Sequence, residues 1–134
     1  MKRGGEGMKI KYELSKSEEE IMEYIWENKE GVTSKTVMEE FNEKKGKFWK
    51  KQTVNTFLSR MVNKGLLNSE LEKNRYTYYP ALTKTEFEQG RAEDVLRLGY
   101  EGSVLKFFQT LNGRPLNEKE IAVLHKVLKG RLQV

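Results

Sequence analysis

Polar side chains able to contact base edges recur along one face of residues 51–63. The apolar residues of this segment stand at positions 54, 57, 58, 61 and 62, which is the spacing of one buried helix face. The opposite face then carries Gln52, Asn55 and Thr56, flanked by Thr53 and Arg60. Glutamine and asparagine make paired hydrogen bonds with adenine, and threonine contacts the methyl group of thymine. This helix face therefore has the chemistry that base recognition in DNA requires.

Cations gather around the same segment. Residues 13–43 are acidic overall, whereas residues 44–75 contain nine lysines and arginines and two carboxylates. Neutralisation of phosphates supplies most of the non-specific affinity of a protein for DNA, so this reversal of charge favours a nucleic-acid partner. The side chains that we expect to approach phosphates or the minor groove are Lys50, Lys51, Arg60, Lys73, Asn74 and Arg75.

Residues for other kinds of chemistry are scarce. The chain has no cysteine, one histidine (His125) and one aspartate (Asp94). The lack of cysteine excludes disulfides, thiolate zinc sites and thiol catalysis, and it fits a reducing cytosol. We find no glycine-rich phosphate loop, catalytic triad or metal-ligand spacing, and no apolar run long enough for a signal peptide or a membrane span. We therefore expect a cytoplasmic protein that is not an enzyme and has no cofactor or metal.

The elements that would position the polar face follow from local signals. Capping boxes and apolar stripes predict one helix from about residue 15 and a second from about residue 33, ahead of the helix over 51–63. Val32-Thr33 leaves room for a short strand or an extended link, and Gly65 stands where the third helix would end. Two extended arms around Lys73-Asn74 predict a β-hairpin.

Three more helices are expected after Pro80, opened by Thr83 with Glu86, by Ser103, and by Asn117 with Glu120. The order of three helices, a hairpin and three helices predicts a mostly α fold with a small β-hairpin, in the α+β class. Its first half has the order of a winged helix-turn-helix, in which the third helix enters the major groove.

This order suggests three parts. Residues 1–13 are predicted to be a flexible N-terminal arm, rich in glycine and lysine, in which Met8 is an alternative start. Residues 14–82 would form the winged helix-turn-helix DNA-binding domain, and residues 83–134 a helical dimerisation region.

Several segments resemble one family. The stretch TVNTFLSRMVNKGLL (Thr53 to Leu67), the hairpin ending in Arg75 to Pro80 and the opening LSKSEEEIMEYIWE (Leu14 to Glu27) are similar to the penicillinase repressor family, the BlaI/MecI group with its copper-responsive CopY relatives. Ser103 to Leu128 resembles the dimerisation region of that family. The resemblance implies a homodimeric transcriptional repressor that binds a palindromic operator and controls antibiotic-resistance or stress genes.

This chain also differs from the family pattern at several positions. Thr53, Thr56 and Arg60 match the family's recognition-helix pattern, whereas Gln52 and Asn55 replace longer basic residues of other members. Antibiotic-responsive members are inactivated through a sensor protease and a cut at an Asn-Phe bond. The corresponding pair here is Lys106-Phe107, which argues against the same cut and leaves a sensor protease open as a partner. The cysteine-rich metal tail of the copper-responsive members is lacking.

The C-terminal helices carry more apolar residues than three short helices can bury by themselves. Pairing of two copies about a two-fold axis would cover them. The residues expected in that interface are Leu96, Val104, Leu105, Phe107, Phe108, Leu111, Ile121, Leu124 and Leu128. The alternative is that these helices fold back on the first helix within a monomer.

Two other functions stay open on the sequence alone. Winged helices also serve as protein-interaction modules, because a fold does not fix a function. A non-specific architectural DNA-binding protein would show the same basic segment without a preference for an operator.

Overall fold

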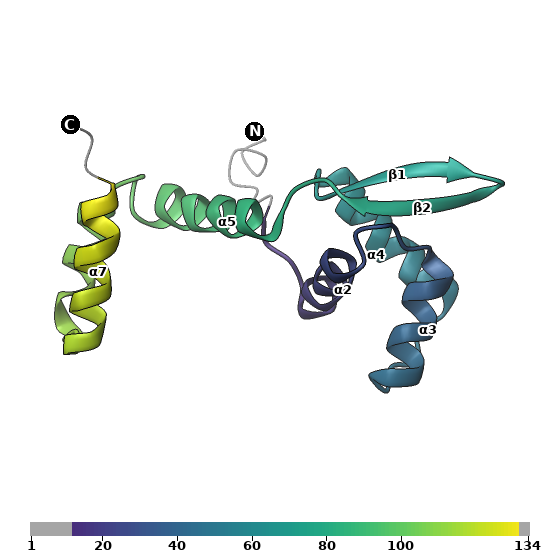
Figure 1. Ribbon diagram of the computed structural model, residues 1–134, viewed down its shortest axis with the longest axis horizontal. Helices are drawn as coiled ribbons and strands as arrows, with labels where there is room; N and C mark the ends of the chain where they lie inside the picture. Colours follow the sequence, from purple (N-terminus) through teal and green to yellow (C-terminus); the bar gives the residue numbers. More distant parts are fainter. Residues whose placement is uncertain (1–11, 132–134) are drawn as a thin grey trace, which may run out of the picture. The chain divides into compact units, whose positions relative to one another are not determined.

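The computed structural model describes residues 12–131 of the chain. Its elements are, in order, α2 (Lys16–Glu27), α3 (Ser34–Lys44), α4 (Lys51–Asn63), β1 (Leu67–Glu72), β2 (Arg75–Pro80), α5 (Lys84–Gly99), α6 (Val104–Thr110), the short 3-10 helix η1 (Leu111–Gly113) and α7 (Glu118–Gly130). This is the predicted order of three helices, a hairpin and three helices, so the α+β winged-helix prediction is confirmed (Figure 1).

The chain forms two compact units, Met1–Val95 and Leu96–Val134, which divide within α5. The first part of α5 belongs to the first unit because Phe87 is buried there against Trp26 and Tyr12, at ring-centroid distances of 5.4 and 5.5 Å. The expected division after residue 82 stays a prediction. Most of the expected N-terminal arm, residues 1–11 including Met8, lies outside the described residues.

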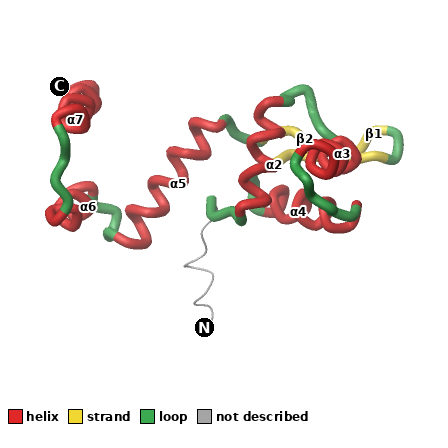
Figure 2. Tube along the Cα trace, turned by 90° about the horizontal axis from the view of Figure 1, so that it is seen from below, coloured by secondary structure: helices red, strands yellow, loops and turns green. Residues whose placement is uncertain are grey.

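The core of the first unit is built from the apolar stripes that the sequence predicts. The helices α2, α3 and α4 turn their stripes toward one another, and the start of the hairpin closes the core. In Figure 2, the two strands lie beside α3 and α4; α4 contacts α3 and β1, and α2 contacts β2. The fully buried side chains are Ile21, Met22, Ile25, Val37, Phe41, Val54, Leu58, Met61 and Leu66.

Local capping fixes where these helices begin and end. Ser15 and Glu18 form the predicted capping box of α2, with the Glu18 amide donating to Ser15 Oγ at 3.2 Å and the Ser15 amide donating to Glu18 Oε1 at 2.9 Å. Thr33 caps α3 in the same way. After α4, Gly65 adopts a φ of +81°, and the Leu66 amide donates to the Met61 carbonyl at 2.9 Å. This is a Schellman ending, which glycine accommodates without steric cost.

The hairpin is an antiparallel pair in which Leu67 lies opposite Pro80 and Glu72 opposite Arg75. Its turn residues Lys73 and Asn74 have φ values of +50° and +65°, which is the arrangement of a two-residue type I′ turn. Val32 adds a short extended link beside β2, since its backbone exchanges two hydrogen bonds with Tyr78, at 3.0 and 2.7 Å.

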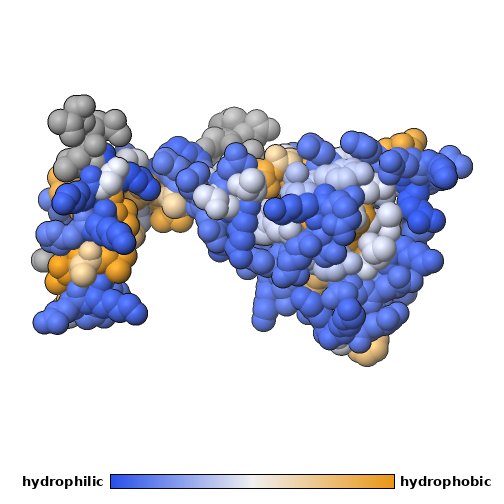
Figure 3. All heavy atoms as spheres, in the orientation of Figure 1, coloured by the Kyte–Doolittle hydropathy of each residue, from blue (hydrophilic) through white to orange (hydrophobic). Residues whose placement is uncertain are grey.

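The second unit consists of the end of α5 with α6, η1 and α7. Ser103 caps α6, and Asn117 with Glu120 forms the predicted capping box of α7. Edge-to-face contacts join Tyr100 to Phe107 at 5.2 Å and Phe107 to Phe108 at 5.6 Å. No side chain that the structure describes between residues 96 and 131 is buried. Apolar surface therefore lies open over this unit (orange on α7 in Figure 3).

Candidate nucleic-acid interface

The helix α4 spans the predicted residues, and it separates a buried face from a polar one. Val54, Leu58 and Met61 are fully buried, which fixes the rotation of the helix in the first unit. The side chains on the opposite face are all exposed, and they include every predicted base-contacting residue. These exposed residues are Lys51, Gln52, Thr53, Asn55, Thr56, Ser59 and Arg60.

The segment before α4 is held in place by an aromatic stack and a side-chain clamp. The Trp49 ring stacks on Phe41 of α3 at 5.0 Å and meets Phe57 of α4 edge-on at 5.2 Å. The side-chain amide of Asn42 donates to the Trp49 carbonyl, and the Trp49 amide donates to Asn42 Oδ1, both at 2.9 Å. These contacts tie the start of α4 to the end of α3.

The start of α4 favours a bound anion. Lys50 occupies the N-cap position without a side-chain cap hydrogen bond, and the first turn holds no acidic residue. Free amides and the positive end of the helix dipole attract negative charge at such a terminus. Lys50 and Lys51 add two exposed cations at the same place.

The basic residues divide into paired and unpaired groups, which the sequence does not show. Lys44, Lys47 and Lys64 lie near Glu40, Glu20 and Glu18, at 3.3, 3.8 and 3.7 Å respectively. The fold therefore brings glutamates of α2 and α3 to the basic segment, in addition to its own Glu70 and Glu72.

Five cations that are predicted to contact phosphates form no such ion pair in the described residues. Within residues 12–131, none of them makes an ion pair with a carboxylate, and each has an exposed side chain. They are Lys50, Lys51, Arg60, Lys73 and Arg75. The positive charge available to a partner is thus concentrated at the start of α4, on its exposed face and at the hairpin turn.

The hairpin turn carries the predicted wing residues at its tip. Lys73, Asn74 and Arg75 are exposed, and the tip extends beyond the neighbouring helices of the first unit (Figure 1). The nearby Glu72 accepts a hydrogen bond from the Thr77 hydroxyl at 3.0 Å. The cations at the tip are therefore free to contact a partner.

Three tyrosines of the first unit have pKa values raised above the usual one. Desolvation is the first cause that raises the pKa of Tyr24, Tyr78 and Tyr79. Nearby glutamates raise the pKa of Tyr24 and Tyr79 further. These phenols stay neutral through the physiological range, so none of them is prepared to act as an acid or base.

Neither a metal centre nor a membrane span is present in the part of the chain that the structure describes. Residues 12–131 contain no cluster of three or more histidine, aspartate or glutamate side chains that could hold a metal ion. No helix in the same range is long and apolar enough to cross a membrane.

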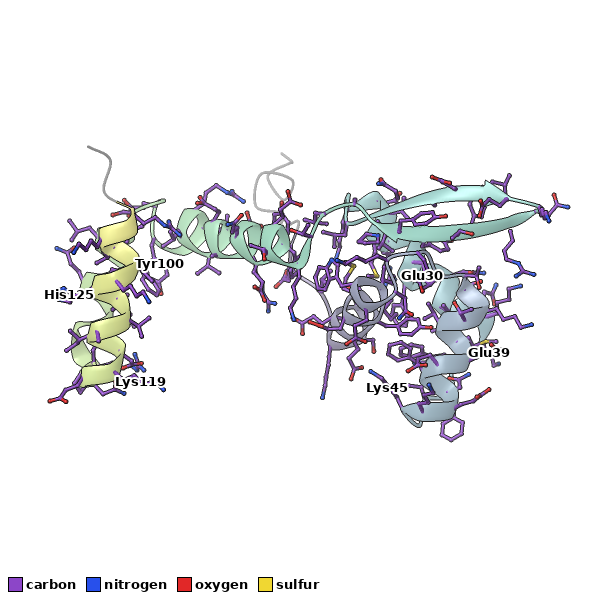
Figure 4. The ribbon with its side chains drawn as sticks, in the orientation of Figure 1. Glu30, Glu39, Lys45, Tyr100, Lys119 and His125 are labelled. Atoms are coloured by element: carbon purple, nitrogen blue, oxygen red, sulfur yellow. The ribbon has the colours of Figure 1, made fainter. Side chains whose placement is uncertain are left out.

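The predicted dimerisation residues lie in the second unit or at its edge. Val104, Leu105, Ile121 and Leu128 are exposed, by 51, 66, 44 and 54% respectively. The other predicted residues, Leu96, Phe107, Phe108, Leu111 and Leu124, are half-buried. An open apolar hollow of about 980 Å³ lies among α6, α7 and the link between them, and its lining includes Phe108, Leu116, Ile121, Leu124, His125 and Leu128. Figure 4 labels His125 on α7.

Sequence reasoning missed two residues of the interface region. Asn42, which clamps Trp49, carries no local signal, because its partner lies seven residues away beyond a turn. Phe48 belongs to no apolar stripe of the sequence, and 94% of its surface is exposed. Its position immediately before a partly buried tryptophan in an extended segment is the signal that could have marked it.

Comparisons with known proteins agree with this architecture. A profile of the family described as "Penicillinase repressor" matches residues 14–130. The "Penicillinase repressor" of Bacillus licheniformis is 28% identical over 112 residues, which cover 79% of this chain and 85% of that protein. The "Methicillin resistance regulatory protein MecI" of Staphylococcus aureus is 25% identical over 124 residues, covering 90% and 96%. The protein of the same name from Mammaliicoccus sciuri is 24% identical with the same coverage.

Proposed function

Because the chain belongs to the penicillinase repressor family, we propose that it represses transcription by binding a palindromic operator in double-stranded DNA as a homodimer. The observation that carries this proposal is the exposed polar face of α4, whose start is uncapped, free of acidic residues and flanked by Lys50 and Lys51. A surface for a protein partner would expose more apolar area on the helix face itself, where every exposed residue from Lys51 to Arg60 is polar.

In this proposal α4 enters the major groove and contacts base edges. Gln52 and Asn55 form paired hydrogen bonds with adenine, which their exposed side-chain amides are able to do. The Thr56 hydroxyl already donates to the Gln52 carbonyl at 3.0 Å, so its methyl group is the part that suits contact with a thymine methyl. Thr53 lies beside them at the start of the helix.

The unpaired cations position the protein on the sugar-phosphate backbone. Lys50, Lys51 and Arg60 flank α4, while Lys73 and Arg75 stand at the hairpin tip with Asn74 between them. Each phosphate that is neutralised releases counterions, so binding weakens as salt concentration rises. The hairpin then acts as the wing, which contacts the backbone or the minor groove.

The second unit supplies the dimer interface. A unit without a buried side chain in its described part gains stability when a second copy covers its apolar residues. A two-fold pair places the same residues on both sides of the interface and presents two copies of α4 to two half-sites. Their spacing is expected to be ~34 Å or a small multiple of it, one turn of DNA or several.

The repressor acts by occupying DNA that the transcription machinery needs. Anything that weakens the dimer also weakens DNA binding, because the two half-sites are bound together. The printed names of the relatives, penicillinase repressor and methicillin resistance regulatory protein, make antibiotic-resistance genes the first targets to test.

A set of four variants tests this proposal. Lys51→Ala and Arg60→Ala should weaken binding to every duplex and lower the salt slope by about one each. Gln52→Ala and Asn55→Ala should cost ~1–3 kcal/mol at particular base pairs and little elsewhere. Fluorescence anisotropy with a panel of single-base operator changes measures both effects. An equal loss on all sequences from Gln52→Ala would rule out base recognition by that residue.

A further inference from the structure

Phe48 is the most exposed of the large apolar side chains in the described residues, with 94% of its surface accessible. It lies in the segment between α3 and α4, three residues before the first residue of α4. A phenylalanine ring in water is unfavourable, and a ring at such a place suggests a surface that covers it in the functional complex.

The backbone around Phe48 is fixed, so its exposure is built into the fold. The Lys47 amide donates to the Phe41 carbonyl at 3.1 Å on one side. Asn42 clamps both backbone groups of Trp49 on the other side. Successive side chains of an extended segment point in opposite directions, so the inward Trp49 ring directs Phe48 and Lys50 outward.

Lysines lie close to Phe48 along the chain on both sides, at positions 45, 47, 50 and 51. Lys45 Nζ lies 4.9 Å from the centre of the Phe41 ring, and Lys47 Nζ lies 5.8 Å from the centre of the Trp49 ring. Figure 4 labels Lys45, the C-cap residue that follows α3. Lys50 and Lys51 stand two and three residues after Phe48 and carry no ion pair within the described part of the chain. A partner must therefore combine negative charge with apolar faces, which is the chemistry of a nucleotide.

We propose that Phe48 is a further DNA-contacting residue, which packs against the deoxyribose or base edge of a nucleotide that flanks the base pairs contacted by α4. This inference rests on the proposed operator binding, since the same duplex supplies the nucleotide. Phe48 extends the interface beyond the start of α4, where Lys50 and Lys51 hold the adjacent phosphates. Its contribution is apolar and therefore nearly independent of salt.

Three variants of Phe48 test the contact. Phe48→Ala should weaken operator binding about 5- to 30-fold, as expected from partial loss of the buried ring area. Phe48→Trp should restore most of the affinity, and Phe48→Lys should restore part of it with a steeper salt dependence. Because the ring is exposed, all three proteins should keep the thermal unfolding midpoint of the wild type.

Shortened duplexes locate the contact. Removing the base pairs that flank each half-site should weaken the wild type more than Phe48→Ala, because both proteins lose phosphate contacts but only the wild type also loses the ring contact. A photo-crosslinking analogue, p-benzoyl-phenylalanine, placed at position 48 of the full chain should label those flanking nucleotides.

The two possible failures are distinguishable. A wild-type protein that binds no duplex at low salt would overturn the proposed function. Specific wild-type binding together with an unchanged affinity of Phe48→Ala would overturn this inference alone. Photo-crosslinking to an added protein of the transcription machinery, with no labelled DNA, would also overturn it and assign the ring to a protein partner.

Discussion

Asn42 offers the sharpest test of how the fold positions α4. Its side chain makes two 2.9 Å hydrogen bonds with the backbone of Trp49, and both groups are partly buried. Asn42→Ala leaves the Trp49 N–H and C=O without these partners. At about 0.5–1.5 kcal/mol for each hydrogen bond, the free energy of unfolding should fall by about 1–3 kcal/mol. The start of α4 should also loosen, so operator affinity should fall.

Urea unfolding followed by tryptophan fluorescence measures this loss. Both tryptophans, Trp26 and Trp49, lie in the first unit, so the signal reports on that unit. At equal protein concentration, the midpoint of Asn42→Ala should lie about 1–2 M urea below that of the wild type. The matched control is Asn68→Ala, an exposed asparagine of β1, which should change stability by less than ~0.5 kcal/mol. Equal midpoints for Asn42→Ala and the control would refute the clamp.

Three other predictions concern the contact of Gly90 with Tyr12, the ionisation of Glu120 and the dimer interface. The new Cβ of Gly90→Ala would lie 2.3 Å from the Tyr12 ring and should displace that ring from Phe87, so the better helix propensity of alanine should give no gain in stability; thermal unfolding checks this. The pKa of Glu120 is lowered by the hydrogen bond from the Asn117 amide and by Arg114. The ionised Glu120 side chain therefore stabilises the fold above pH 4.5, and this stabilisation is lost as pH falls through the lowered pKa. Circular dichroism should show that Glu120→Gln loses less helix in acid than the wild type. Leu124→Asp should give monomers in sedimentation, and a persistent dimer would place the interface elsewhere.

Local signals explain why much of the fold was predictable. The bounds of α4 coincide with the predicted segment because an apolar stripe and Gly65 mark it within the sequence itself. The hairpin follows for the same reason, since Lys73-Asn74 separates two arms rich in strand-forming residues. Signals of this kind act over a few residues, which is the range that sequence patterns cover well.

Contacts between distant residues were not predictable. The pairing of Lys47 with Glu20 and of Lys64 with Glu18 depends on how α2 packs against the rest of the first unit. The exposure of Phe48 depends on the clamp by Asn42, which sequence spacing does not reveal. Tertiary packing therefore decides which cations of the basic segment stay available and which are neutralised.

In the candidate interface too, local patterns predicted some residues, and tertiary packing determined the others. The exposed face of α4, with Gln52, Asn55 and Thr56, followed from helical periodicity, because burial of Val54 and Leu58 leaves only one orientation. The contribution of the segment before α4 did not follow, since an extended segment has no stripe that marks its outer side. The identity of its outward residues needed the structure.

The measurement that tests the central claim most directly is a titration of the full chain against a duplex from the region upstream of its own gene, at two salt concentrations, with molar mass from light scattering. The shuffled duplex of the same composition is the control. We expect tight binding of two chains to the native duplex, weakened by salt, and much weaker binding to the shuffled one. Equal affinity for both duplexes, or binding by a single chain, would contradict the account of a dimeric, operator-specific repressor.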